Sequence, residues 1–256
     1  MPDKAIEALI SFSWYRCNCA KPDLEIAKHA VSMVKAFGDK NYIASSLWYL
    51  GTTSSYLGEF YAAYDHLKEA YQLYNALLPS QKWYFRKGFL LRKKNHLRAF
   101  TRNPSEHDSH RLCCQCGIDM VEMARLTFED GDKVVSMARD VEKQAATVSD
   151  DDVHSESLMM LGLALDNCGK RREALCHLEH AKQMRIANGI LRPDVYYSIA
   201  AVQHYEKRLP EALDAAEEAW KLSEPDNDLV THARIFFLLG TILFCANRDT
   251  EAWKYL

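Results

Sequence analysis

The chain has 256 residues, 48% of them hydrophobic and 26% charged, and its formal net charge is −3. This composition is typical of a globular protein with a large core, and a nearly neutral charge argues against nucleic acid as a partner. No apolar run approaches the roughly 20 residues of a membrane-spanning helix, and the N-terminal segment MPDKAIEALISF lacks a basic leader and a small-residue cleavage site. We therefore expect a soluble, cytoplasmic protein that does not enter a membrane.

The secondary structure expected from the sequence is helical throughout. Only ten Gly and seven Pro are present, and alternating Val, Ile and Thr runs between turn residues, which would indicate strands, are missing. The eight Cys belong to a chain that a helical core would already stabilise, so we expect reduced, mostly buried thiols rather than disulfides. The predicted fold class is all-α.

Small residues recur along the chain with steps of 36 to 40 positions. In the clearest copies, Gly51 is followed twelve residues later by Ala63, and Gly162 is followed twelve residues later by Ala174. This offset carries the chain along one helix, around a short turn and back, and two such helices approach closely only where both carry small side chains. The anchors of the seven copies are Ala27, Ala63, Phe100, Ser136, Ala174, Ala212 and Ala252. The spacing therefore predicts stacked helical hairpins, an α-solenoid.

Two segments carry the pattern most completely: LWYLGTTSSYLGEFYAAYDHLKEAYQL (residues 47–73) and LMMLGLALDNCGKRREALCHLEHAKQM (158–184). With their Leu-Gly pair, turn Gly and two Ala positions on the second helix, they resemble the tetratricopeptide repeat (TPR) family, in a variant with repeats longer than the usual length of about 34 residues. In later copies Lys207 and Asn247 replace the turn Gly. The resemblance implies about seven helix-turn-helix repeats in a right-handed superhelix, and a binding habit rather than a particular substrate.

A single domain of residues 1–256 is expected to contain every repeat. The repeats are predicted near residues 8–41, 44–78, 81–116, 117–152, 155–190, 193–228 and 233–256, of which the last is incomplete. The third and fourth copies are degenerate, and the polar segment Thr101–Ser109 is predicted to be a loop insertion that shortens the second helix of the third copy. After Ala252 only four residues follow in the sequence, so the last hairpin would leave an apolar face open to a partner or to a second copy of the chain.

The first helix of each repeat should line the concave face of the solenoid. The residues in this register are rich in Trp, Tyr and Phe, which give much contact area for little ordering entropy. The alternative is that these aromatic side chains pack against the neighbouring repeat. The predicted partner-binding residues are Trp48, Tyr56, Phe85, Phe89, Arg92, Lys93, Tyr197 and Phe237. The same register in the last two copies also includes His204, Tyr205, Thr241 and Phe244.

One segment carries a single sign of charge. Eight Lys and Arg residues lie within residues 82–102, and no acidic residue occurs within 72–105. Within this segment, Arg92 and Lys93 are predicted to select an acidic protein or peptide ligand. The alternatives are a solvated helix face and a site for RNA phosphates. RNA is disfavoured because the mostly apolar inner positions lack the periodic polar pairs that read bases.

A zinc-like pattern occurs at His107, His110, Cys113 and Cys116. On a helix these positions extend over about 13 Å, too far for one tetrahedral ion, so no metal site is predicted. No HExxH, GxSxG or GxGxxG motif occurs, and the acidic run Asp150–Asp152 is expected to cap a following helix rather than to supply a catalytic group. We therefore predict no enzyme and no cofactor.

The function that these patterns favour is a protein-protein interaction scaffold or adaptor that binds a peptide or helix of a partner in its concave groove. One alternative is the sensor or regulatory arm of a larger signalling protein, such as a nucleotide-switched ATPase, in which similar arrays often occur. A second alternative is an RNA-binding helical-repeat protein. Self-association through the last repeat is a further expectation.

Overall fold

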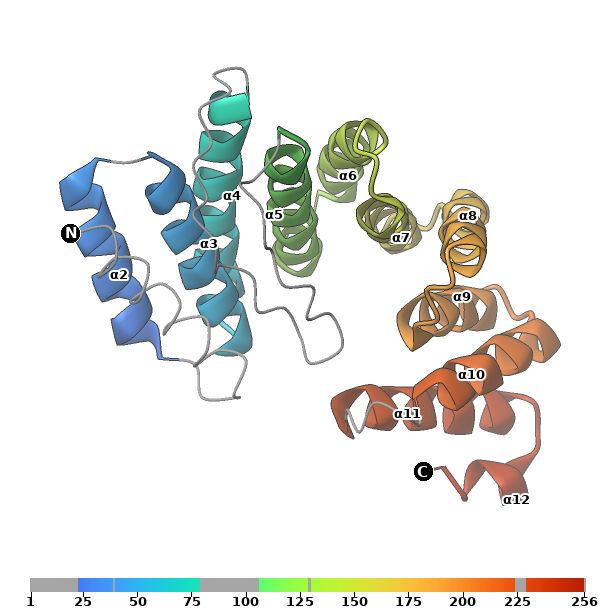
Figure 1. Cartoon of the computed structure of the whole chain (residues 1–256). Helices are drawn as coiled ribbons and strands as arrows, with labels where there is room; N and C mark the ends of the chain where they lie inside the picture. Colours follow the sequence, from blue (N-terminus) through green and yellow to red (C-terminus); the bar gives the residue numbers. More distant parts are fainter. Residues whose placement is uncertain (1–22, 39, 79–105, 129, 224–228, 256) are drawn as a thin grey trace. The chain divides into compact units, whose positions relative to one another are not determined.

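The computed structural model describes residues 23–38, 40–78, 106–128, 130–223 and 229–255. Within these ranges the chain forms helices and turns without a β-strand, which confirms the predicted all-α class (Figure 1). The chain divides into two compact units, of which unit 1 comprises residues 1–129 and 147–149 and unit 2 comprises residues 130–146 and 150–256. The single domain over residues 1–256 stays a prediction. None of the described helices combines the length and the apolar character that crossing a bilayer requires.

Unit 1 contains the described helices α2 (Leu24–Phe37), α3 (Lys40–Tyr56), α4 (Phe60–Leu77) and α5 (Glu106–Thr127). Helices α3 and α4 form a hairpin, α2 packs against α3, and α5 packs against α4. The hairpin is close because Gly51 has no side chain: a Cβ at this position would lie 2.7 Å from Leu67 Cγ. The small residue predicted from the repeat pattern therefore sets the approach of the two helices.

Unit 2 contains the described helices α6 (Gly131–Ala145), α7 (Asp151–Asn167), α8 (Arg171–Ala187), α9 (Pro193–Tyr205), α10 (Leu209–Ser223), α11 (Leu229–Cys245) and α12 (Asp249–Ala252). Consecutive helices pack against one another from α6 to α12. Helix α9 also contacts both α7 and α11, so the first helices of successive hairpins lie side by side. The Oδ1 atom of Asp150 accepts a hydrogen bond from the Val153 N–H over 3.1 Å, which confirms the predicted cap at the start of α7.

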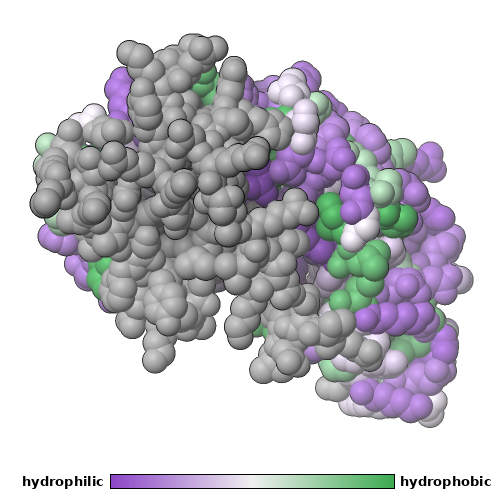
Figure 2. Space-filling view, in the orientation of Figure 1, coloured by the Kyte–Doolittle hydropathy of each residue, from purple (hydrophilic) through white to green (hydrophobic). Residues whose placement is uncertain are grey.

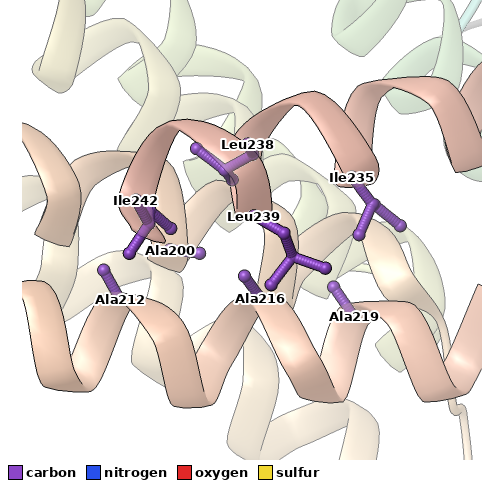
Figure 3. Packing of buried hydrophobic residues seen from close by; sticks show 8 residues of the cluster. All are labelled: Ala200, Ala212, Ala216, Ala219, Ile235, Leu238, Leu239 and Ile242. Carbon is purple, nitrogen blue, oxygen red and sulfur yellow. The ribbon is translucent and has the colours of Figure 1, made fainter. Parts of the chain in front are cut away.

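The core between the last hairpins of unit 2 pairs small side chains with large aliphatic ones (Figure 3). Helix α10 presents alanines at three- and four-residue spacing, and α11 places Ile and Leu side chains over them. The buried cluster consists of Ala200, Ala212, Ala216, Ala219, Ile235, Leu238, Leu239 and Ile242. One face of α11 is therefore fully committed to packing inside unit 2.

The turns between paired helices keep a left-handed backbone with or without glycine. Gly58 and Gly169 have φ angles of 80° and 72°, and Lys207 and Asn247, which replace this Gly in later copies, have φ angles of 60° and 58°. A left-handed backbone conformation costs a residue with a Cβ, such as Lys207, roughly 1–2 kcal/mol. The packing of the two helices therefore dictates the turn, and glycine only makes it easier to form.

Helix α5 departs from the predicted repeat boundaries. It runs without a break through residues 116 and 117, where a boundary was predicted, and residues 106–109 of the predicted loop insertion are also helical. The rest of that insertion, residues 101–105, lies outside the described part of the chain. Buried residues recur at helical spacing across the predicted boundary, at Cys113, Cys116, Met120 and Ala124. One continuous buried face explains why the helix does not stop.

Candidate partner-binding surface

Four of the eight predicted contact residues belong to the third predicted repeat, residues 81–116. Phe85, Phe89, Arg92 and Lys93 fall within residues 79–105, outside the residues that the structure describes. The selection of acidic ligands by Arg92 and Lys93 therefore stays a prediction.

Trp48 does not lie on an open surface. Its side chain is 6% exposed, and its Nε1–H donates a hydrogen bond to Asp119 Oδ2 on α5 over 2.7 Å. The indole also stacks on Tyr49 and meets the edge of Tyr74, with ring centroids 6.2 Å away in both cases. The assignment of Trp48 to the partner-binding surface is thus corrected: a neighbouring first helix covers it, as in the alternative explanation of the aromatic pattern.

Tyr56 is exposed at the C-terminal end of α3. Leu57, Phe60 and Tyr61, in the adjoining turn and at the start of α4, are exposed too. These residues form an apolar patch at the tip of the α3–α4 hairpin. The patch belongs to unit 1 alone.

The two predicted residues of unit 2 belong to a larger surface, which we call the aromatic face. It consists of Tyr197 and Tyr205 on α9 and of Arg234, Phe237 and Phe244 on α11; Tyr197 is half-buried and packs partly against the core cluster of Figure 3. Phe237, Phe244 and Tyr205 are 68%, 59% and 61% exposed, respectively. Because Tyr197 and Tyr205 are eight residues apart, and Phe237 and Phe244 seven, each pair lies on one side of its helix. Helices α9 and α11 pack against each other, and the two sides meet where the Arg234 guanidinium lies over the Tyr197 ring.

Tyr205 and Phe244 are not among the eight predicted partner-binding residues, although the same register contains them. Both occur four or five residues beyond the small residue of a first helix, Ala200 or Gly240. Figure 2 shows hydrophobic residues, in green, between hydrophilic residues, in purple, on the part of unit 2 that this view leaves uncovered. Tyr205 and Phe244 are indicated in the sequence by their spacing from the small residue of the first helix, rather than by any property of a single copy.

The electrostatics of the aromatic face depend on two arginines. The Arg234 Cζ atom lies 4.9 Å from the centroid of the Tyr197 ring, and the Arg171 Cζ atom lies 5.4 Å from that of Tyr205. Such cation–π contacts contribute roughly 0.5–1 kcal/mol at exposed sites. The Arg171 Nε atom also lies 3.3 Å from Asp166 Oδ1. Among the described residues, no carboxylate lies within 4.0 Å of the Arg234 guanidinium.

The zinc-like pattern is only partly described, because the His107 side chain lies outside the described part of the chain. Cys113 and Cys116 are buried on α5, and the Cys116 thiol donates to the Leu67 carbonyl oxygen over 3.6 Å. Burial raises the pKa of the Cys116 thiol well above its ordinary value. In the ranges that the structure covers, no three His, Cys, Asp or Glu side chains gather closely enough to hold a metal ion.

Comparison with known proteins gives a fold but no relative by sequence. No protein-family model matches the chain, and no curated protein matches its sequence. An aspartyl phosphate phosphatase F from Bacillus subtilis is 15% identical with a TM-score of 0.67, over 96% of this chain and 57% of that protein. A Signal Transduction ATPase with Numerous Domains from Pyrococcus horikoshii, which carries a tetratricopeptide repeat sensor, is 12% identical with a TM-score of 0.66, over 96% of this chain and 34% of that protein.

A third similar structure is a Rap conjugation gene regulator of a plasmid, in complex with the Phr* peptide. It is 13% identical with a TM-score of 0.59, over 84% of this chain and 52% of that protein. The chain thus spans little more than half the length of the phosphatase and of the Rap regulator, and about a third of the length of the ATPase. At these identities the likeness concerns the fold, and the chain has the helical-repeat fold of the tetratricopeptide type.

Proposed function

We propose that the chain is a scaffold that binds a peptide or helix of a partner protein on the aromatic face of unit 2. The exposure of Phe237 and Phe244 carries the proposal, because adjoining exposed aromatic side chains mark interaction sites on protein surfaces. Arg234 adds a cation beside them. The five residues of the aromatic face offer contact area and charge, which suits binding rather than catalysis.

A peptide as the kind of ligand is supported by the Rap regulator, whose structure contains one. The second candidate function is the sensor arm of a larger signalling protein. It is favoured by the repeat sensor of the similar ATPase. A scaffold and a sensor arm both need a surface that binds a ligand, and the aromatic face can serve either function.

Affinity capture from extracts of the cells that produce the protein tests the proposal. The bait is compared with a Phe237→Ala, Phe244→Ala variant and with Tyr61→Ala, a control that removes an aromatic side chain of matching 69% exposure from unit 1. We expect at least one protein to be retained by the wild type and by Tyr61→Ala but lost by the double variant. Identical capture by all three baits would contradict a binding role for the aromatic face.

A further inference from the structure

Helix α11 is apolar on the side that unit 2 does not bury. Its sequence, LVTHARIFFLLGTILFC, contains no acidic residue, and Ile235, Leu239 and Ile242 already pack inside unit 2 on one side (Figure 3). On another side, Val230, Phe237 and Phe244 follow one another at seven-residue spacing, and each is more than half exposed. These three residues span about 20 Å of helix. A stripe of large apolar side chains along a helix is normally packed against another element.

The preceding hairpins show what covers this side of a first helix. Phe237 lies three residues before the small residue Gly240, and the residues at the same offset in α3, α7 and α9 are Trp48, Met159 and Tyr197. Trp48 and Met159 are each 6% exposed, and Trp48 donates a hydrogen bond to Asp119 on α5. Tyr197 lies under Arg234 of α11. At this offset, therefore, the side chains on α3 and α9 are each contacted by another helix: Trp48 by α5 and Tyr197 by α11.

A second offset gives the same result. Phe244 lies four residues after Gly240, and its counterpart on α9 is His204, four residues after Ala200. The His204 Nε2 atom lies 3.5 Å from Cys245 Sγ on α11. Both positions of α9 that correspond to Phe237 and Phe244 are thus contacted by a helix lying alongside.

From these correspondences, and on the basis of the proposed function, we infer that the aromatic face binds an amphipathic α-helix of a partner protein, which lies along α11 as α11 lies along α9. The partner helix presents apolar residues at three-, four- and seven-residue spacing to Phe237 and Phe244. It places an Asp or Glu side chain next to Arg234. An extended peptide would match the seven-residue spacing of α11 poorly, because its side chains alternate.

Charge complementarity distinguishes this occupant from a second copy of the chain. In a symmetric pair of α11 helices, each aromatic face would bring a second Arg234 and no carboxylate, because α11 has no acidic residue. A different helix with a carboxylate satisfies the Arg234 guanidinium, whose contact on the aromatic face is the ring of Tyr197. The inference therefore commits to a partner protein.

Two displayed libraries test this inference on the full chain. One presents a randomised helix on a small three-helix scaffold, and the other presents random linear peptides. We expect binders from the helix library, with apolar residues at helical spacing and at least one Asp or Glu. Their affinity should fall at least about tenfold with Phe237→Ala, Phe244→Ala and with Arg234→Gln, and should stay unchanged with Tyr61→Ala. Circular dichroism of each variant checks that it is folded.

The other outcomes overturn the inference in distinguishable ways. Linear peptides that are lost with Phe237→Ala, Phe244→Ala, without matching helices, would leave the proposed function standing and contradict the helical partner. Helices without acidic residues, whose affinity ignores Arg234→Gln, would contradict the charge assignment. The absence of any binder sensitive to the double variant would contradict both proposals. Sedimentation of the chain alone tests a further outcome. If the wild type is a dimer and the Phe237→Ala, Phe244→Ala variant is a monomer, a second copy is the occupant and the inference is contradicted.

Discussion

The indole N–H of Trp48 donates a hydrogen bond to Asp119 Oδ2 over 2.7 Å and thereby ties α3 to α5. Trp48 is 6% exposed, so its N–H is shielded from solvent, whereas Asp119 is half-buried. A hydrogen bond from a shielded N–H to a carboxylate contributes more than an exposed one, and its loss leaves the donor unsatisfied. The pair therefore holds two first helices of unit 1 together.

Replacing Asp119 should destabilise unit 1. We expect Asp119→Ala to lower the free energy of unfolding by about 1–3 kcal/mol, because the Trp48 N–H loses its acceptor in a buried place. Urea unfolding followed by tryptophan fluorescence and circular dichroism measures the change. Asp65→Ala, at an exposed position of α4, is the matched control and should stay within about 0.5 kcal/mol of the wild type. Equal stabilities for Asp119→Ala and the control would contradict the role of this bond.

Gly162 should not tolerate a side chain, although alanine is the better helix former. A Cβ at Gly162 would lie 2.8 Å from Leu178 Cγ and 3.2 Å from the Ala174 carbonyl oxygen. Overpacking typically costs about 1–3 kcal/mol, which outweighs a gain of up to about 1 kcal/mol in helix propensity. We therefore expect Gly162→Ala to lower the melting temperature. If the clash is the cause, the effect should shrink in a Leu178→Ala background, and a Gly162→Ala protein more stable than the wild type would contradict the close approach.

Arg185 is 1% exposed, and its Nη1 atom lies 2.5 Å from Asp194 Oδ1. Removal of Asp194 would leave a buried guanidinium without its carboxylate, which typically costs about 3–5 kcal/mol. Asp194 itself is 40% exposed, so we expect Asp194→Ala to fall toward the lower end of that range. Arg139→Ala, which breaks the exposed Arg139–Glu173 pair, should cost less than about 1 kcal/mol. Urea unfolding measures the free energy of unfolding of both variants. Equal losses of this free energy would show that burial does not strengthen the Arg185–Asp194 pair.

Two tyrosines should make unit 1 sensitive to alkali. Burial raises the pKa of Tyr49 and of Tyr74 above the ordinary value near 10. A group with a raised pKa in the folded state contributes stability that is fully present below its unfolded pKa and is lost as the pH rises through the folded pKa. The free energy of unfolding should therefore fall as the pH rises above about 10, and it should fall less steeply for Tyr49→Phe. Equal slopes for the wild type and Tyr49→Phe would contradict this account.

Much of the fold could be predicted from the sequence because close helix packing constrains which side chains fit. Gly51 and Gly162 indicate two hairpins, since a larger side chain at either position would clash with Leu67 or Leu178 on the second helix. The boundary inside α5 was wrong because the degenerate copies have lost that sharp requirement, and only the continuous burial of the helix face reveals its length.

The candidate site could be predicted only in part. Register alone places Trp48, Tyr197 and Phe237 at the same position of successive first helices, but it does not say which neighbour covers that position. Asp119 covers Trp48, Arg234 lies over Tyr197, and Phe237 is left 68% exposed. The difference comes from tertiary contacts between residues 37 and 71 positions apart, which no single copy of the repeat encodes.

Site-specific photocrosslinking tests the central claim most directly. A photoreactive benzoylphenylalanine replaces Phe237 in one protein and Tyr61 in another, since both side chains are similarly exposed. After irradiation in an extract of the producing cells, we predict a discrete crosslinked partner at position 237 that position 61 does not give, and crosslinks that map to one side of a helix in that partner. The same products from both positions, or none at position 237, would contradict the claim that the aromatic face is the binding surface.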